Sequence, residues 1–501
     1  MQNDWRQIDI RWLAVIASLA VSVSTLLFQG EPNADAYTYV RTAEIFLSDG
    51  VVAAYQHYFW ATYSILIAAV SWFGIDLFSA GLLVNSFFYA LLVFAFISII
   101  REIDDSRPLL LIAAIILLVY PQLNEYRNSI IRDIGYWALS VFALWQYLLF
   151  TRTQLTKHAL CYCGSLLFAA AFRVEALAYL ILTPFSLLLD IRFEPKIRKK
   201  LLLKLGGILL TTAIFMSLCL ALMGLNIANL FIEFISVYQP FIEAKFTLPE
   251  EERALLGSLL FGDHATLYSR EYIELFLLVG LAAILLANLF NAIGGPYLTV
   301  LLLGYFSKKR MSLERHITTP VIFYILINAL ILTAFLIITR FLSSRYAMLL
   351  CIMLVVFVPL IIQHFYSAIK EPSRRKAQLA FAIFLSYCAI DSYYSFGEEK
   401  PYITDSIEWI RENTDTSAKL LTNNHSIAYF SGKVSEYDQV QRNLTEEAIF
   451  ATGVGDTIAA ELTFETKQTL EKSSVSRKIE FLTAFPNEKN QRIVLYKRVN
   501  L

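Results

Sequence analysis

RWLAVIASLAVSVSTLLF (residues 11–28) is followed almost at once by EPNADAY (residues 31–37). The first stretch is apolar and long enough to cross the hydrocarbon core of a membrane. The second brings two carboxylates, Glu31 and Asp35, to the mouth of that span. Because a charge that faces lipid is costly, Asp35 is expected to face water or a cavity. Glu31 lies closer to the end of the span and is the weaker site candidate.

The composition is that of a membrane protein. Hydrophobic residues make up 57% of the chain, charged residues only 17%, and the mean hydropathy is +0.55, which predicts a protein with many membrane spans. The formal net charge is zero, so no overall field attracts nucleic acid. The five cysteines lie in apolar stretches, where a thiol packs as a small hydrophobic group, and no disulfide framework is expected: Cys161, Cys163, Cys219, Cys351 and Cys388.

Apolar runs predict eleven transmembrane helices, near residues 11–28, 80–100, 108–122, 134–151, 158–172, 175–190, 201–224, 286–306, 317–338, 346–366 and 377–394. Basic residues recur in every second loop between these spans, and short cytoplasmic loops are enriched in Lys and Arg. The alternation predicts a cytoplasmic N-terminus and a C-terminus on the outer face. The expected outer loops are residues 29–79, 123–133, 225–272 and 339–345.

Some apolar segments are not expected to cross the membrane. A crossing at Phe59–Gly74 would invert the side of every later basic loop, so we predict an interfacial helix there, rich in amphipathic aromatic residues. Ala36–Asp49 is a second interfacial helix of the first outer loop. Tyr272–Leu285 is expected to be a third, because one helix from there through Phe306 would be overlong.

Charged residues become much more frequent after Tyr394. We therefore divide the chain into a transmembrane domain, residues 1–394, and a soluble outer domain, residues 395–501. In the second, residues 405–413 have helical spacing and residues 418–422 resemble a buried strand. Residues 480–485 and 492–499 flank a turn-rich segment and predict a hairpin. The soluble part is thus expected to be a small α/β domain.

Two acidic groups are candidates for chemistry at the outer face. Asp35 opens the first outer loop, and Asp133 directly precedes the fourth span. Two carboxylates that converge there could deprotonate a hydroxyl group or hold a divalent cation. The alternative is that each only caps the helix that follows it, since an acid is favoured at a helix N-terminus. Glu125 is a further acid in the same outer segment as Asp133.

Arginines at the expected outer ends of the membrane spans are candidates for binding phosphate, because the planar guanidinium group presents several hydrogen-bond donors in a fixed, forked arrangement. An expected outer turn contains Arg173 and Glu175. The two residues either form the charged floor of a cavity or pair only with each other. The loop between two later spans contains Arg340, Arg345 and Tyr346. These residues either bind a phosphate group or anchor the spans, with their charged ends at the membrane surface.

Two histidines, His57 and His264, lie in the expected outer loops. Each either lines a pocket or is simply exposed. The outer loop of residues 225–272 contains His264 and is long enough to act as a lid over the site.

Together these motifs resemble the GT-C superfamily of membrane glycosyltransferases, which includes lipid A aminoarabinose transferases, protein O-mannosyltransferases and oligosaccharyltransferases. The resemblance rests on the acidic motif of residues 31–37, the acid Asp133 before the fourth span, the Arg-x-Glu turn of residues 173–175, the Arg-Tyr pair of residues 345–346 and the outer C-terminal domain. The segments 409–413, 420–423 and 429–432 also resemble the tails of bacterial members. The expected fold is a GT-C-like polytopic helical domain with a small α/β tail.

The resemblance implies an inverting glycosyltransferase of the bacterial inner membrane that uses a sugar linked to a polyprenyl phosphate such as undecaprenyl phosphate. It implies that Asp35 is the general base and that Asp133 orients the acceptor. The donor phosphate would be bound by Arg345, Arg340, Tyr346 and Arg173. The family often has two adjacent acids in its first motif, whereas Ala36 follows Asp35 here. Metal dependence is therefore open, and a cation, Mg²⁺ or Mn²⁺, would be held by Asp35 and Asp133.

Two alternatives have the same architecture. One is a non-catalytic flippase or exporter of lipid-linked glycans, although the charged residues found here lie at helix ends rather than near mid-membrane, where transporter sites usually lie. The other is a periplasmic glycan polymerase or ligase. Linear motifs identify neither the sugar nor the acceptor, so lipid, glycan and protein acceptors are all open, and membrane lipids are the expected surroundings.

Overall fold

The computed structural model describes residues 8–27, 30–246, 250–269, 272–307, 314–394, 400–415 and 418–500. The first part of the chain is helical. Its helices are α1 (Ile10–Leu27), α2 (Ala34–His57), α3 (Thr62–Ser71), α4 (Leu77–Ile103), α5 (Arg107–Leu118), α6 (Pro121–Asn124), η2 (Glu125–Asn128), α7 (Asp133–Thr153), α8 (Thr156–Ala170), α9 (Ala176–Leu182), η3 (Thr183–Leu189), α10 (Pro195–Leu222), α11 (Ile227–Phe246), α12 (Glu250–Phe261), α13 (Asp263–Ser269), α14 (Ile273–Ile293), α15 (Gly295–Phe306), α16 (Arg315–Thr339), α17 (Ser344–Val355), α18 (Phe357–Ala368) and α19 (Glu371–Tyr393).

The protein is a multi-pass membrane protein. Within the described residues, six helical segments are long and apolar enough to cross a membrane, or seven if the pair bent by 53° at residues 107–128 counts as one span. The six are Leu77–Ile103, Asp133–Thr153, Pro195–Leu222, Ile273–Ile293, Arg315–Thr339 and Ser344–Ala368. Among the described residues there are also four shorter apolar helices. Ile10–Ser24, Ala176–Leu189 and Gly295–Phe306 coincide with expected spans, whereas Thr62–Ser71 lies in the segment expected to be interfacial. The expected total of eleven stays a prediction.

One local expectation was wrong. Tyr272–Leu285 is not a separate interfacial piece, because α14 continues to Ile293 and the chain breaks at Gly294. Gly294 has φ 76°, and a Cβ there would lie 2.4 Å from Oε1 of Gln122, so only glycine fits this turn. The segment expected as the outer loop of residues 225–272 contains helices in its described parts, and its place outside the membrane stays a prediction. The helix expected at Ala36–Asp49 is confirmed as the first part of α2, which begins at Ala34 and continues to His57 beyond a break at Gly50.

The C-terminal domain is a small α/β unit, as expected. Its elements are α20 (Pro401–Asn413), β1 (Leu420–Thr422), α21 (His425–Ser431), α22 (Glu446–Ala451), β2 (Thr457–Glu461), α23 (Phe464–Glu471), α24 (Ser473–Ser476), β3 (Ile479–Asn487) and β4 (Asn490–Arg498). The sheet order is β1-β2-β4-β3; β1 is parallel to β2, and β4 is antiparallel to both neighbours. The helix, first strand and hairpin were predicted, whereas β2 was not.

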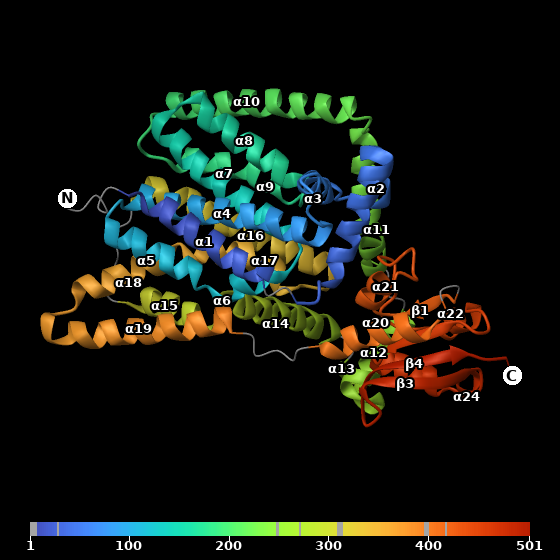
Figure 1. Cartoon of the computed structure of the whole chain (residues 1–501). Coiled ribbons are helices and arrows are strands. Elements are labelled where there is room, and N and C mark those ends of the chain that lie inside the picture. Colours follow the sequence, from blue (N-terminus) through green and yellow to red (C-terminus); the bar gives the residue numbers. More distant parts are fainter. Residues whose placement is uncertain are drawn as a thin grey trace, which may run out of the picture.

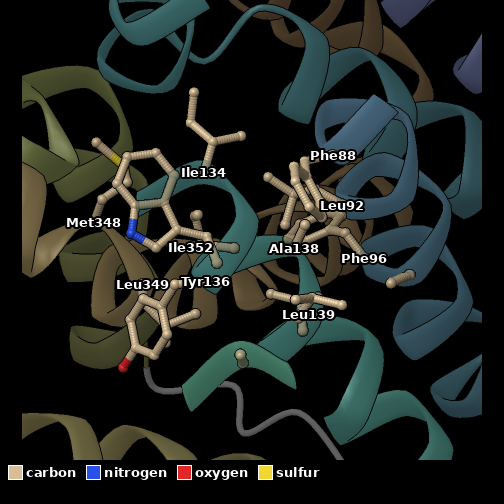
Figure 2. Close-up of a cluster of buried hydrophobic side chains, with 14 of the residues drawn as sticks. Phe88, Leu92, Phe96, Ile134, Tyr136, Ala138, Leu139, Met348, Leu349 and Ile352 are labelled. Carbon is tan, nitrogen blue, oxygen red and sulfur yellow. The ribbon is translucent and has the colours of Figure 1, made fainter. Parts of the chain in front are cut away.

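The helices form a bundle with α10 along one edge and α19 along the opposite edge (Figure 1). The helix α2 lies across one end of the bundle and contacts α21 of the C-terminal domain. The interior is closely packed. In Figure 2, Ile134 and Ala138 of α7 lie between Phe88 and Leu92 of α4 on one side and Met348 of α17 on the other. This packing fixes the first turn of α7, which carries Asp133.

Gly135 allows that close approach, and its replacement tests the packing. A Cβ at Gly135 would lie 2.7 Å from the ring of the buried Phe172 and 3.2 Å from that of Phe88. We expect Gly135→Ala to lower the free energy of unfolding in detergent micelles by about 1–3 kcal/mol, since overpacking a core displaces its side chains. Gly164→Ala in α8, where a Cβ meets nothing within 4 Å, is the matched control. Equal stability of both variants would contradict the prediction.

Candidate active site

The exposed part of the candidate site is an ion pair between α2 and α17. Nη1 of Arg345 donates to Oδ2 of Asp35 at 2.5 Å, and the two side chains are 28% and 42% exposed. The start of α2 is fixed by Asn33, whose side chain bonds both backbone groups of Ile130 at 2.7 and 3.2 Å. Asp35 in the first turn is thereby brought to Arg345 in the first turn of α17.

A buried triad lies next to this pair. Arg173 donates to Asp133 through Nη1 and to Glu175 through Nη2, both at 2.6 Å. Burial alone would raise the pKa of Glu175, but the charge of Arg173 and its hydrogen bond outweigh that effect and lower the pKa. The triad is therefore charged and internally neutralised. Asp133 lies at the first turn of α7, as the capping alternative requires, yet its carboxylate also bonds Arg173.

Tyr346 joins the two groups of charges. The guanidinium carbon of Arg173 lies 4.3 Å from the centre of the Tyr346 ring, and that of Arg345 lies 5.2 Å from it. Arg345 also interacts electrostatically with Asp133. Nε of Arg345 is buried and has no hydrogen-bond partner among the described residues. The site is thus one cluster of charges, and the partly exposed pair of Asp35 and Arg345 lies at its edge.

The other candidates lie elsewhere. Arg340 is exposed and ends α16 in a left-handed conformation, with φ 53°. Glu125 is exposed in η2 and lies near the charge of Asp391. His264 is exposed on α13, and His57 contacts the C-terminal domain instead of the cluster.

Two contributors were not predicted. Arg132, adjacent to Asp133, donates to the backbone oxygen of Phe172 at 2.5 Å, and its guanidinium lies 4.2 Å from the centre of the Trp60 ring. The Arg132-Asp133 dipeptide was a signal that could have found it. The Tyr126 hydroxyl lies 3.2 Å from Oγ of Ser344, beside Arg345, and no linear motif marks it.

The described residues do not fit a metal site in this arrangement. No group of three or more His, Cys, Asp or Glu side chains in the described ranges is placed to hold an ion. Asp35 and Asp133 each have a carboxylate oxygen bonded to an arginine, and a bound cation would have to displace that positive charge.

The cavities at the two ends of the bundle differ greatly in volume. Beside Arg173, Glu175 and Tyr346 there is only about 10 Å³ of space, room for roughly one water molecule. A cavity of about 960 Å³ lies at the opposite end of α7 and includes Arg152 among its lining residues. Among the described residues of the cluster, Asp35 and Arg345 are the most exposed, so we expect a large ligand to approach the cluster from their side.

Comparisons with solved structures identify the fold. No family model matches the chain, and no curated protein matches it. Among solved structures, the oligosaccharyltransferase of Archaeoglobus fulgidus in complex with Zn and sulfate matches with a TM-score of 0.53 and 13% identity, over 98% of this chain and 73% of that one. The archaeal oligosaccharyltransferase AglB of the same organism, in complex with an inhibitory peptide and a dolichol-phosphate, matches with a TM-score of 0.52 and 14% identity, over 90% and 69%. The chain has the GT-C fold.

Proposed function

We propose that the protein is an inverting glycosyltransferase that moves a sugar from a polyprenyl-phosphate-linked donor to an acceptor on the outer face of a bacterial inner membrane. The observation that carries the proposal is the accessible pair of Asp35 and Arg345 at one end of a GT-C-type bundle. It combines a proton acceptor with a phosphate-binding cation. The similar oligosaccharyltransferase with a bound dolichol-phosphate supports a lipid-linked donor.

The reaction is a single displacement at the anomeric carbon of the donor. The acceptor hydroxyl or amine attacks that carbon and gives its proton to Asp35, while the bond between the carbon and the phosphate oxygen breaks. The lipid phosphate leaves with the electron pair of that bond, and the configuration inverts. Negative charge grows on the leaving phosphate, so a cation there is worth more in the transition state than in the bound substrate.

Donor binding would also prepare the base. In the free protein Asp35 shares its proton-accepting oxygen with Arg345. A phosphate that takes the guanidinium of Arg345 would release Asp35 to accept a proton. Arg173 is occupied by two buried carboxylates, so we assign it to holding Asp133 in place, and Arg340 and Tyr346 remain secondary candidates for the phosphate.

The distribution of basic residues supports the membrane orientation that we propose. Arg11, Arg101 and Arg152 line the large cavity at the end of the bundle away from Asp35. Basic residues favour the cytoplasmic side, which supports an outer-facing site, a cytoplasmic N-terminus and a periplasmic domain at residues 395–501.

A direct assay tests the proposed function. The purified protein is reconstituted with a polyprenyl-phosphate-linked sugar and with lipid, glycan or peptide acceptors, and the product is identified by mass spectrometry and its anomeric configuration by NMR. Release of free lipid phosphate with an inverted glycoside supports the proposal. Movement of an intact lipid-linked sugar across the vesicle without bond cleavage would favour the carrier, and products that grow by repeated addition would favour a polymerase.

Arg345 gives a second test, of the donor phosphate. We expect Arg345→Gln to lower kcat/KM for the donor by about 10²-fold or more, since one donor to a developing anion has about that effect. Arg345→Lys should lose less, because it keeps the charge but not the planar fork. Arg101→Gln, at the opposite end of the bundle and 43% exposed, is the control. Equal activities of the two Gln variants would reject the role of Arg345.

A further inference from the structure

The helix α2 has two differently occupied faces. Successive residues of a helix turn by about 100°, so Tyr37 and Glu44 share one face and Asp35 and Tyr39 another. Asp35 bonds Arg345, and the Tyr39 ring lies 4.9 Å from that of Tyr63 in α3. This second face therefore belongs to the transmembrane domain. The face of Tyr37 and Glu44 meets the C-terminal domain instead.

Tyr37 makes the first contact with that domain, two residues after Asp35. Its side chain is buried, and its hydroxyl lies 2.7 Å from Oγ of Ser426. Its ring stacks on that of His425 at 5.5 Å. Tyr37, about half a helical turn after the candidate base, is thus held by Ser426 and His425 at the start of α21.

Two further contacts continue along α2. The Tyr437 hydroxyl donates to Oε2 of Glu44 at 2.8 Å. His57 bonds Thr42 through Nδ1 at 3.0 Å, and its Nε2 lies 3.0 Å from the nearly buried carboxylate of Asp438. Contacts at 37, 44 and 57 therefore run the whole length of the helix.

These contacts lie on both sides of the break in α2. Gly50 has φ 88° and ψ −174°, so the helix is interrupted between Glu44 and His57. A helix with a break at its middle is not held straight by its own hydrogen bonds. The C-terminal domain contacts both halves, and His57 also ties the second half back to Thr42 in the first.

We infer that the C-terminal domain positions the catalytic carboxylate: by holding α2 through Tyr37, Glu44 and His57, it sets where Asp35 stands relative to Arg345 and the substrate. The inference rests on the proposed function of Asp35. The residues of this contact do not touch the reacting atoms, so they are positioning residues. A carboxylate displaced by a fraction of an ångström from its productive geometry loses rate while the donor still binds.

A double-mutant cycle tests the first contact in the full-length protein. Tyr37→Phe and Ser426→Ala each remove the same hydrogen bond, and we expect each to lower kcat about 3- to 10-fold, with an unchanged KM for the donor. The double variant should lose no more than either single variant, and Ser426→Thr should retain the wild-type kcat. Tyr429→Phe is the control, because its hydroxyl forms no hydrogen bond with the described residues whereas its ring packs against Tyr37. Additive losses, or a loss in KM alone, would overturn the inference.

Amide hydrogen exchange tests the contact without any activity. In the Ser426→Ala/Tyr437→Phe double variant, amides of residues 34–49 should exchange about 10-fold faster than in Tyr429→Phe, because the helix is no longer held. Unchanged exchange would overturn the inference. A wild-type protein that transfers no sugar, combined with faster exchange in the double variant, would reject the proposed function and leave the structural contact standing.

Discussion

Asp35→Asn is expected to lower the rate of sugar transfer by about 10³-fold, within the 10²–10⁴-fold contribution typical of a general base. Asparagine keeps the size of the side chain and an oxygen that can accept from Arg345, but it cannot take the proton of the acceptor. The side chain is 42% exposed, so the folded state should survive. The measurement is initial-rate transfer with a saturating lipid-linked donor, and the loss should appear in kcat.

Glu31→Gln is the matched control for that experiment. Glu31 is exposed, precedes α2 and differs from Asp35 in having no part in the cluster of charges, so its amide variant should transfer sugar at the wild-type rate. Both variants should elute as monodisperse protein in detergent. Full activity of Asp35→Asn would remove Asp35 from the mechanism, and equal losses at both positions would point to a general effect of charge at this membrane surface.

The sequence predicted the parts of the site that are encoded by neighbouring residues. The Arg173-Val-Glu175 turn forms a local ion pair, one of the two interpretations of its sequence, because its members are two positions apart. Asp35 became a candidate from its position at the mouth of a span, where a charge facing lipid is costly, and the structure pairs it with Arg345; its role in the reaction stays a prediction. Hairpin strands β3 and β4 were found from the turn between them. In each instance the signal and the structure involve the same short stretch of chain.

Pairs of residues that are far apart in the sequence could not be predicted from it. Asp35 and Arg345 are 310 positions apart, and nothing in either segment specifies the other. The same holds for His57, for which the sequence left open a pocket or simple exposure, and which pairs with Asp438 of the C-terminal domain. The break after α14 lies at Gly294, where an added Cβ would meet the side chain of Gln122 from a distant helix, and the apolar spacing of the sequence placed this break wrongly. Such features follow from packing, which a single sequence does not record.

The buried triad gives the largest expected effect on stability. Arg173→Met should lower the free energy of unfolding by about 3–5 kcal/mol, because it leaves Asp133 and Glu175 buried without a cation. Arg101→Met, which breaks an exposed pair with Asp9, should cost less than about 1 kcal/mol. Chemical unfolding of both variants in the same micelle measures the difference.

The loss in Arg173→Met should also depend on pH. In the wild type the lowered pKa of Glu175 contributes stability above its ordinary value of about 4.3, and this contribution is lost only as the pH falls below that value. Without Arg173, burial dominates and raises the pKa of Glu175, so the buried carboxyl group is better tolerated when protonated. The variant should therefore become more stable as the pH is lowered from about 8 to about 5, whereas Glu175 leaves the wild type nearly unchanged over that range. A deficit independent of pH would mean that the lost packing of the arginine side chain, and not two unpaired carboxylates, destabilises the variant.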